Sequence, residues 1–359
     1  MNKVAFINEL YGTKRQGGEQ EAMHELAERL NKISSFAVDT FSYKNSDEKK
    51  TIKSIIPLFF RQLPFLRDVF VLPLIGRKLI KEIEGNYNAI HSSSITLFSL
   101  YKSKKPYFIT CHAIRSQKVE KLSKIRKYKL LFNPLFKILL RNLERKGLKN
   151  AAQIIVIKDE MRNYLIDKMQ VNEDKIKVIP NAVDIDKFKP ASGDRKYILF
   201  VGRGTVPKGI DTIIEAAKNI KSKILVVTKI ISNNFLQLGK KRGIKFIFNV
   251  SHAEINKIYD KAKIFILPSL DEEQPLTILE AMSSGLPVVT TEIGSGGLVK
   301  DGINGIIISP KNPKELEEAV NKLTEDLELS EKMGKENRLK IEQNFSWEAV
   351  IEKYSELYK

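Results

Sequence analysis

The segment YILFVGRGTVPKGIDTIIEAA (residues 197–217) contains the local pattern that decides the fold of this protein. It starts with a short apolar run that ends in glycine, continues through a polar loop and closes with an amphipathic stretch. A strand, a glycine-containing loop and a helix in this order form half of a βαβ unit, from which parallel sheets are built. The segment therefore predicts an α/β fold.

The same alternation extends in both directions along the chain. Apolar runs with strand character recur, separated by helical stretches, at 3–8, 36–41, 87–91, 106–110, 151–157, 223–228, 244–248, 263–268 and 286–290. No solenoid period or low-complexity tract interrupts this pattern. We therefore predict doubly wound α/β architecture, in which ligands bind at the carboxyl ends of the strands.

The chain length predicts two domains, because 359 residues exceed the size at which one hydrophobic core usually stops growing. Residues 178–196, VIPNAVDIDKFKPASGDRK, combine prolines, a glycine and several aspartates, which is the chemistry of turns and linkers. We place the boundary in this segment, with residues 1–184 and 185–343 as Rossmann-like domains that face each other across a cleft.

The composition is that of a globular protein, with 42% hydrophobic and 29% charged residues. The single cysteine, Cys111, forms no internal disulfide and excludes a zinc site built from several thiolates, as expected in a reducing cytosol. The segment MNKVAFINELYG lacks the apolar region of a signal peptide, and no apolar run approaches the ~18 residues that span a bilayer. We therefore expect a cytoplasmic protein that is soluble or peripherally attached to a membrane.

The net charge of +18 is unevenly distributed. Residues 1–150 contain 29 basic and 13 acidic side chains, a net charge of +16, whereas the remainder carries +2. In two segments, 51–83 and 115–149, basic residues such as Lys121, Lys124 and Lys127 alternate with large apolar ones. Such a surface favours binding to an anionic membrane. The alternative is an internal helix with a solvated basic face.

Arg203 and Lys208 lie on the glycine-containing loop between the strand and the helix of the opening segment. Such a loop offers backbone N–H groups and a helix dipole to phosphate, and the two cations would neutralise a diphosphate. The loop is not a Walker A motif, because Ile210 stands where that motif requires lysine. A solvated turn is the alternative interpretation.

Two carboxylates stand out in LPSLDEEQPLTILEAMSSGLPVVTT (residues 267–291). Glu272 belongs to a polar loop, and Glu280 belongs to the helix that Pro275 opens. A loop carboxylate can contact a reacting sugar, whereas a helical one can accept hydrogen bonds from two ribose hydroxyls. The first N–H groups of the helix, near Leu276 and Thr277, can bind phosphate. For Glu280 alone, an ordinary surface position is the alternative.

Taken together, these segments resemble the retaining glycosyltransferases of family 4, whose architecture of two Rossmann-like domains is called GT-B. VIPNAVDIDKFKP resembles the interdomain signature of the family, FVGRGTVPKGIDTIIEA its diphosphate loop, and PSLDEEQPLTILEAMSSGLPVV its E-x7-E motif. The C-terminal residues 344–359 resemble the last helix of the family, which crosses back to the N-terminal domain.

The resemblance implies roles for individual residues. Arg203 and Lys208 match the residues that bind the donor pyrophosphate and stabilise the leaving nucleoside diphosphate in place of a metal ion. Glu280 matches the ribose-binding glutamate, and Glu272 matches the glutamate near the anomeric centre. No cofactor or metal is expected.

The resemblance also extends to the N-terminal half, where the family binds its acceptor. Gly17 and Gly18 match a glycine pair that lets donor phosphate and acceptor approach the backbone. His112 matches a histidine at a strand end near the transferred sugar, although a structural role is an equal alternative for a lone histidine.

The chain departs from the family pattern at three places. Glu273 and Gln274 replace a Gly-Phe pair, which adds a carboxylate beside the donor pocket. Gly297 lies nearest to the position of a missing glutamate, and Ala182 replaces a frequent glycine. None of these changes removes Arg203 or Glu272, so an active enzyme is expected.

Asp184 and Asp186 have the D-x-D spacing with which other glycosyltransferases hold a metal ion. They lie in the linker signature, so a turn or helix-capping role is the better prediction.

The resulting hypothesis is a retaining hexosyltransferase. It uses a UDP- or GDP-sugar as donor and a hydroxyl of a growing, lipid-linked glycan as acceptor, at the inner face of the cell membrane. The alternatives are a basic nucleic-acid-binding protein, a sugar-nucleotide epimerase on the same architecture, and an inactive scaffold. The donor-binding residues favour the transferase over nucleic acid binding.

Overall fold

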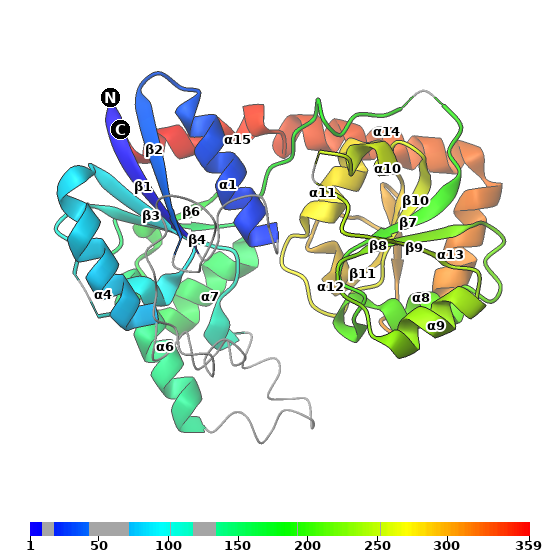
Figure 1. Cartoon of the computed structure of the whole chain (residues 1–359), viewed down its shortest axis with the longest axis horizontal. Helices are drawn as coiled ribbons and strands as arrows, with labels where there is room; N and C mark the ends of the chain where they lie inside the picture. The colour runs from blue at the N-terminus through cyan, green and yellow to red at the C-terminus, as the bar shows by residue number, and fades with distance from the viewer. Residues whose placement is uncertain (9–17, 43–71, 101, 118–133, 192, 252) are drawn as a thin grey trace. The chain divides into compact units, whose positions relative to one another are not determined.

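The structure is a computed structural model that describes residues 1–8, 18–42, 72–100, 102–117, 134–191, 193–251 and 253–359 (Figure 1). The chain divides into two compact units: unit 1 contains residues 1–180 and 351–359, and unit 2 contains residues 181–350. The sequence suggested boundaries at 184/185 and 343/344. Each unit contains one six-stranded, parallel sheet, which confirms the predicted α/β class with two Rossmann-like folds.

The sheet of unit 1 has the strand order β2-β1-β3-β4-β5-β6. Its strands are β1 (Asn2–Asn8), β2 (Phe36–Ser42), β3 (Ala89–Ser92), β4 (Tyr107–Cys111), β5 (Gln153–Val156) and β6 (Ile176–Val178). Strands β1, β3, β4 and β5 are almost completely buried, as expected for a parallel sheet with helices on both faces. The order reverses between β1 and β3, which places the start of α1 and the end of β4 near this switch point.

The helices of unit 1 cover both faces of its sheet. They are α1 (Gly18–Asn31), α4 (Leu72–Ile83), α6 (Pro134–Lys149), α7 (Asp159–Met169) and the C-terminal part of α15 (Trp347–Leu357), with short 3₁₀ turns at η2 (Glu84–Asn86), η3 (Ile95–Phe98) and η5 (Glu173–Lys175). Leu79 of α4, Leu148 of α6 and Leu165 of α7 share one apolar core with Ile7 of β1. These three helices therefore cover one face.

The C-terminal residues 351–359 complete the core of unit 1 on the opposite face. The Tyr358 ring packs against Phe6, Phe36 and Phe108, and its hydroxyl hydrogen-bonds to Nδ1 of His91. Nε2 of His91 lies 2.8 Å from Oγ1 of Thr110. Complete burial, with a smaller effect of His112, lowers the pKa of His91 to about 3, so this ring is neutral at physiological pH.

The sheet of unit 2 has the order β12-β11-β10-β7-β8-β9. Its strands are β7 (Tyr197–Val201), β8 (Ile224–Thr228), β9 (Lys245–Phe248), β10 (Ala262–Leu267), β11 (Val288–Thr291) and β12 (Gly305–Ile308). The chain moves outward from β7 to β9 and then returns to place β10 on the other side of β7. The loops after β7 and β10 therefore meet at the switch point of the sheet.

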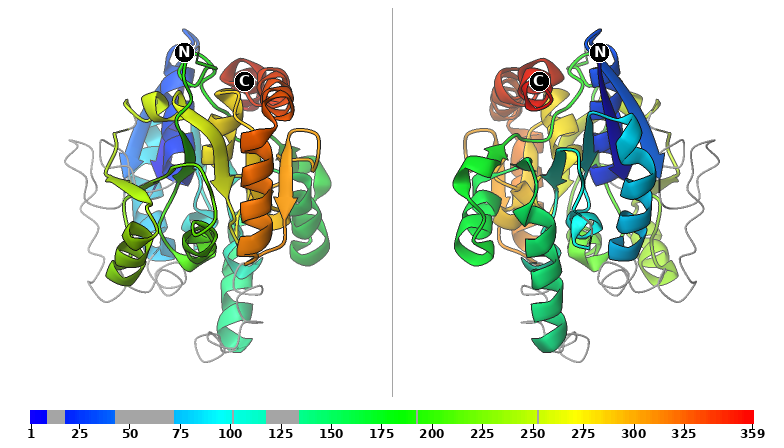
Figure 2. Two further views of the ribbon diagram at one scale, coloured as in Figure 1. Left: turned by 90° about the vertical axis from the view of Figure 1, so that its right-hand side faces the viewer. Right: turned by 90° about the vertical axis from the view of Figure 1, so that its left-hand side faces the viewer.

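Helices lie on both faces of the sheet of unit 2 as well. The elements are η6 (Val206–Lys208), α8 (Ile210–Ala216), α9 (Asn233–Lys241), α10 (Asn256–Tyr259), α11 (Leu276–Ser283), α12 (Glu292–Ser295), α13 (Pro313–Glu325) and α14 (Leu327–Asn344). Figure 1 shows α8, α9 and α13 on one side of the sheet and α11 and α14 on the other. Helix α13 lies beside β12 (Figure 2, left). Asn312 caps α13, whose first residue is proline.

Two strands were missing from the sequence prediction, β6 and β12. Strand β6 has only three residues, which carry too little pattern, whereas the apolar run of β12 between Asn304 and Ser309 was a usable signal. The predicted strands at 87–91, 151–157 and 286–290 correspond to β3, β5 and β11 with ends shifted by one to two residues. Among the helices of the described residues, none is both long and apolar enough to cross a membrane.

Candidate functional site

The loop between β7 and α8 carries Arg203 and Lys208, the two predicted phosphate ligands. Arg203 follows the end of β7 and is exposed, and Lys208 ends the 3₁₀ turn η6. Gly209 then adopts a left-handed φ of +77°, and a Cβ at this position would lie only 2.2 Å from the carbonyl oxygen of Pro268. Glycine is therefore required here, because it lets the loop approach the end of β10.

Glu272 lies opposite Lys208, on the loop that follows β10. Nζ of Lys208 forms an ion pair with Oε1 of Glu272. Oγ of Ser269 lies 2.9 Å from the same carboxylate oxygen and 2.8 Å from the carbonyl oxygen of Pro207. The Glu272 side chain is 8% exposed and that of Lys208 is 20% exposed, so the pair is largely withdrawn from water. The structure thus brings a predicted phosphate ligand and a predicted sugar ligand into direct contact.

Glu280 lies on α11, one turn after the start of the helix. Its Oε2 accepts a hydrogen bond of 2.7 Å from the hydroxyl of Tyr259, which is also 3.3 Å from the carbonyl oxygen of Thr277. The Tyr259 ring is completely buried between Phe188 and Phe265. Burial, and then the charge and hydrogen bond of Glu280, raise the pKa of Tyr259, so its hydroxyl remains a donor. Tyr259 therefore fixes the orientation of the Glu280 carboxylate.

The first turn of α11 contains Leu276 and Thr277, both half-buried. Pro275 is the N-cap, and no side chain caps this helix. This turn directly follows the loop that carries Glu272, and the binding of phosphate by its N–H groups stays a prediction.

The candidate residues of unit 1 are described only in part. Gly18 is the first residue of α1, whereas Gly17 lies outside the described residues. His112 directly follows β4 and is 9% exposed. The lysines at 121, 124 and 127 also lie outside the described residues.

Asp184 has the turn role that the sequence predicts. Its Oδ1 accepts hydrogen bonds from the backbone N–H groups of Asp186 and Lys187, at 3.1 and 2.9 Å. Across the residues that the structure describes, no three His, Cys, Asp or Glu side chains are arranged to hold a metal ion.

The comparisons with known proteins agree with the two units. Residues 16–187 match the family model described as Glycosyltransferase Family 4, and residues 183–340 match the model described as Glycosyl transferases group 1. The chain belongs to glycosyltransferase family 4. This membership confirms the resemblance of the sequence motifs, and it makes the protein a glycosyltransferase of GT-B type.

Curated relatives of this glycosyltransferase are moderately similar. "Uncharacterized glycosyltransferase MJ1607" of Methanocaldococcus jannaschii is 28% identical over 58% of this chain, and the alignment spans 60% of that relative. The UDP-Gal:alpha-D-GlcNAc-diphosphoundecaprenol alpha-1,3-galactosyltransferase of Escherichia coli is 31% identical over 62% of this chain and 64% of its own length. The capsular polysaccharide biosynthesis glycosyltransferase CapM of Staphylococcus aureus is 25% identical over 86% of this chain and 95% of its own length.

Solved structures share the fold of the glycosyltransferase over its whole length. Sucrose-phosphate synthase of Thermosynechococcus elongatus has a TM-score of 0.81 at 20% identity, and the match covers 100% of this chain and 98% of that one. Alr3699/HepE of Anabaena, in complex with UDP and glucose, has a TM-score of 0.74 at 16% identity over 99% of both chains. At these identities the likeness concerns the fold alone.

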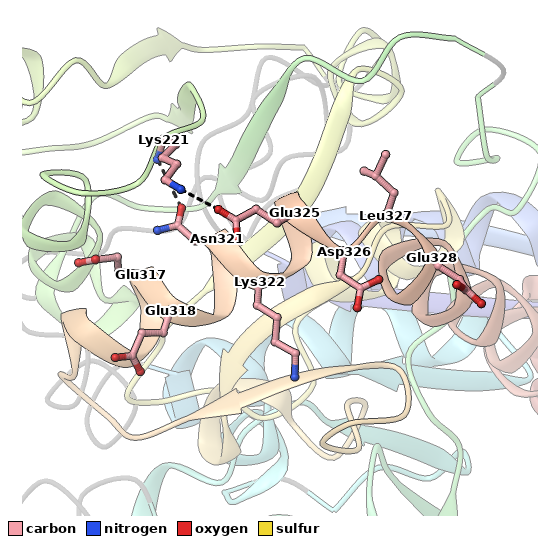
Figure 3. A pocket seen from close by; sticks show the side chains of 9 residues that line it. All are labelled: Lys221, Glu317, Glu318, Asn321, Lys322, Glu325, Asp326, Leu327 and Glu328. Carbon is pink, nitrogen blue, oxygen red and sulfur yellow. Dashed lines mark hydrogen bonds and ion pairs between the residues drawn. The ribbon is translucent and has the colours of Figure 1, made fainter.

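Unit 2 of the glycosyltransferase has a cavity of about 830 Å³ along α13 and the start of α14 (Figure 3). It is lined by Lys221, Glu317, Glu318, Asn321, Lys322, Glu325, Asp326, Leu327 and Glu328. Nζ of Lys221 is paired with Glu325 at 2.7 Å, which leaves a surplus of negative charge. Since such a lining repels a diphosphate, this cavity does not compete with the motif residues as the donor site.

Three supporting residues of the site were not identified from the sequence: Tyr259, Ser269 and Gln274. Tyr259 is 21 residues before the glutamate that it contacts, in a stretch that sequence alone describes only as helical. Ser269 is only three residues before Glu272, so the sequence offered a signal for a contact between this hydroxyl and the carboxylate. In the sequence Gln274 stands out only as a departure from the family pattern, and in the structure it hydrogen-bonds to Asn181.

Proposed function

We propose that this glycosyltransferase moves a hexose from a UDP- or GDP-sugar to a hydroxyl of a growing, lipid-linked glycan, with retention of configuration and without a metal ion. The observation that carries the proposal is the contact of Lys208 with Glu272 at the switch point of unit 2. The cation that would bind the diphosphate and the carboxylate that would bind the sugar are therefore adjacent. A nucleotide-sugar donor needs this arrangement, because its diphosphate is bonded directly to its sugar.

The chemical roles follow from charge and geometry. Arg203 and Lys208 neutralise the diphosphate and stabilise the charge that develops on it as the bond from C1 to the phosphate oxygen breaks. Glu280, oriented by Tyr259, accepts hydrogen bonds from the ribose hydroxyls. Glu272 contacts hydroxyls of the transferred sugar.

Retention is explained by attack on the face from which the diphosphate leaves. The acceptor oxygen forms its bond to C1 while the C1–O bond of the donor breaks, and the acceptor proton passes to the departing phosphate oxygen. No side chain then has to act as a nucleophile, and positioning together with charge stabilisation supplies the acceleration.

The choice of donor and acceptor is supported by the relatives. The Anabaena structure contains UDP and glucose, the E. coli relative is named for a diphosphoundecaprenol acceptor, and the S. aureus relative is named for capsular polysaccharide. The test is transfer by the purified enzyme from a panel of UDP- and GDP-sugars to lipid-linked saccharides, with the anomeric configuration of the product read by NMR. Absence of transfer from every donor would overturn the proposal, and an inverted product would overturn the mechanism.

Membrane attachment through unit 1 is the second part of the proposal. It is supported by the net charge of +16 in residues 1–150 and by apolar side chains that α4 and α6 expose, namely Leu74, Ile138 and Leu139. Basic residues beside exposed apolar ones favour the interface of an anionic bilayer, where each cation contributes about 1 kcal/mol.

Flotation with liposomes tests this attachment. We expect binding to vesicles that contain anionic lipid, weaker binding at high salt, and loss of binding when Lys121, Lys124 and Lys127 are replaced by glutamine. The matched control replaces three exposed lysines of unit 2, Lys240, Lys241 and Lys245, and should bind like the wild type. Equal losses in both triple variants would show that only the total charge matters.

A further inference from the structure

The loop that carries Glu272, residues 268–275, is held at its first half by the neighbouring diphosphate loop. The backbone N–H of Leu270 donates to the carbonyl oxygen of Pro207 at 2.8 Å, and Oγ of Ser269 lies at the same distance from that oxygen. Oγ1 of Thr291 also donates to the carbonyl oxygen of Ser269. These contacts fix the chain before Glu272, but they do not constrain the chain after it.

The second half of the loop is held by a reciprocal pair of hydrogen bonds between Gln274 and Asn181. The backbone N–H of Asn181 donates to Oε1 of Gln274 at 2.6 Å, and Nδ2 of Asn181 donates to the carbonyl oxygen of Gln274 at 3.0 Å. Gln274 is 9% exposed and Asn181 is 8% exposed. Each side chain thus satisfies a backbone group of the other residue in a place that water hardly reaches.

The backbone of Gly296 also approaches this half-loop closely. Its φ is +57°, and a Cβ there would lie 2.5 Å from the carbonyl oxygen of Glu273 and 3.0 Å from Cα of Gln274. The backbone of residues 273–275 thus packs against the turn at Gly296 and is hydrogen-bonded to Asn181. The contact with Asn181 supplies the directional bonds that hold this half of the loop.

Asn181 is the residue at which the chain enters unit 2 after Pro180. Two residues later, the N–H of Val183 donates to the carbonyl oxygen of Phe345 at 2.9 Å, and Val183 forms a parallel bridge with Ser346. The entry segment is thus itself anchored to the chain that leads into α15. Gln274 consequently ties the Glu272 loop to a fixed part of unit 2 that is remote from it in sequence.

We propose that Gln274 is a positioning residue, which holds Glu272 in place for transfer by tying its loop to Asn181. The inference rests on the proposed function, since it assumes that Glu272 contacts the transferred sugar. Gln274 is also one of the two residues that depart from the Gly-Phe pair of the family, and it makes a directional amide contact at that position. Arg203 and Lys208, which are assigned to the diphosphate, lie on the loop after β7 rather than on the loop that Gln274 holds.

The central test compares Gln274→Met, which keeps the shape and removes the acceptor, with Gln274→Glu, which keeps an acceptor oxygen for the N–H of Asn181. We expect Gln274→Met to lower kcat by about 10- to 100-fold, because a small displacement of a residue that positions the reacting sugar costs this much. The dissociation constant of UDP should change far less than kcat, since Arg203 and Lys208 keep their places on another loop. Gln274→Glu should recover most of the lost kcat.

Asn181→Ala is the second variant, because it removes the other bond of the pair without altering the loop that carries Glu272. Its loss should again lie in kcat, and the double variant should lose less than the product of the single losses, as expected for residues in contact. The matched control is Gln237→Met on the exposed face of α9, which should behave like the wild type.

Amide hydrogen exchange separates failure of this inference from failure of the proposed function. In Gln274→Met, peptides that cover residues 181–184 and 270–276 should exchange faster than in the wild type, whether or not any donor is turned over. Unchanged exchange, or an unchanged kcat in an active enzyme, overturns the positioning role. If the wild type transfers no sugar, but these peptides exchange faster in Gln274→Met than in the wild type, the proposed function is overturned. The hydrogen-bonded contact between Gln274 and Asn181 is then still supported.

Discussion

Lys208 and Glu272 belong to two different strand-to-helix loops of unit 2, and their side chains form an ion pair where the strand order of the sheet reverses. Before a donor binds, the cation assigned to the diphosphate is therefore neutralised by the carboxylate assigned to the sugar. A diphosphate must share or displace this partner.

Replacing Lys208 with alanine should reduce kcat/KM by about 10²- to 10³-fold, since it removes a preorganised charge at the leaving diphosphate. Initial rates of transfer measure the effect. The control is Lys218→Ala, whose ammonium pairs with Glu215 on the surface of the same unit and should have little influence. Near-normal activity of Lys208→Ala would refute the role assigned to this residue.

Replacing Glu272 with glutamine should strengthen UDP binding while it abolishes most of the transfer. The ammonium of Lys208 is released from its carboxylate, and a negative charge next to the phosphate is lost, so we expect UDP to bind at least about fivefold tighter. Titration calorimetry gives the dissociation constant. Glu273→Gln, which removes the neighbouring carboxylate, should have a smaller effect, and weaker UDP binding by Glu272→Gln would contradict the competition.

Replacing Tyr259 with phenylalanine should raise the KM for the donor by about 3- to 10-fold with a smaller change in kcat. The variant keeps the buried ring and loses only the hydrogen bond that orients Glu280, an interaction with a charged group. Tyr197→Phe is the matched control, because its hydroxyl donates to the carbonyl oxygen of Ile258 in the same unit. If both variants raise KM equally, the effect reflects general destabilisation.

Replacing Glu144 with glutamine should change the pH dependence of stability. Burial raises the pKa of Glu144 to about 7 from its ordinary 4.5, against the hydrogen bonds from Ser116 and Arg115 that lower it. The folded state therefore retains a proton that the unfolded state releases, and its contribution to stability is lost as the pH rises from 4.5 through 7. The variant lacks this loss, so its stability relative to the wild type should rise with pH by about 1.4 kcal/mol per unit.

The titration of His91 gives the stability of the protein the opposite pH dependence over much of this range. Its pKa is lowered from 6.5 to about 3, so its contribution is present above pH 6.5 and is lost as the pH falls. The two slopes oppose each other between pH 4.5 and 6.5 in the wild type. Urea unfolding at several pH values checks the prediction, and a Glu144→Gln curve parallel to that of the wild type would disprove the raised pKa.

Removal of divalent metal ions should leave transfer unchanged. Arg203 and Lys208 supply the positive charge that a metal would give to the diphosphate, and Asp184 uses its carboxylate to hold the turn at Asp186. The measurement is the rate of transfer with excess EDTA, compared with the rate in added Mg²⁺ or Mn²⁺. A loss of activity that only a metal restores would refute metal independence.

Much of the fold was predictable because strand and helix patterns are local. The segment 197–217 contains a strand, a loop and a helix whose order survives in β7, η6 and α8. The contact of Lys208 with Glu272 could also be anticipated, since adjacent strands of a parallel sheet bring their C-terminal loops together. Strand β6 was not predictable, because three residues carry too little pattern.

The supporting contacts of the site could not be predicted, because they join residues far apart in sequence through single hydrogen bonds. Gln274 and Asn181 are separated by 93 positions, and neither residue has a composition signal that names the other. The sequence flagged Gln274 only as an exception to the family pattern and associated it with the donor pocket. The structure instead directs its side chain to the entry segment of unit 2.

Unit 1 is built from two separate parts of the chain, residues 1–180 and 351–359, and this affects how it folds during synthesis. The face of its sheet that holds His91, Phe6 and Phe108 is covered by Tyr358, and Asn2 donates to the carbonyl oxygen of that same residue at 3.0 Å. A ribosome delivers residues 351–359 only after all of unit 2 has been made. Until translation reaches α15, the nascent N-terminal sheet therefore lacks the apolar cover that Tyr358 supplies, and the folding of unit 1 is completed only after unit 2 has been made.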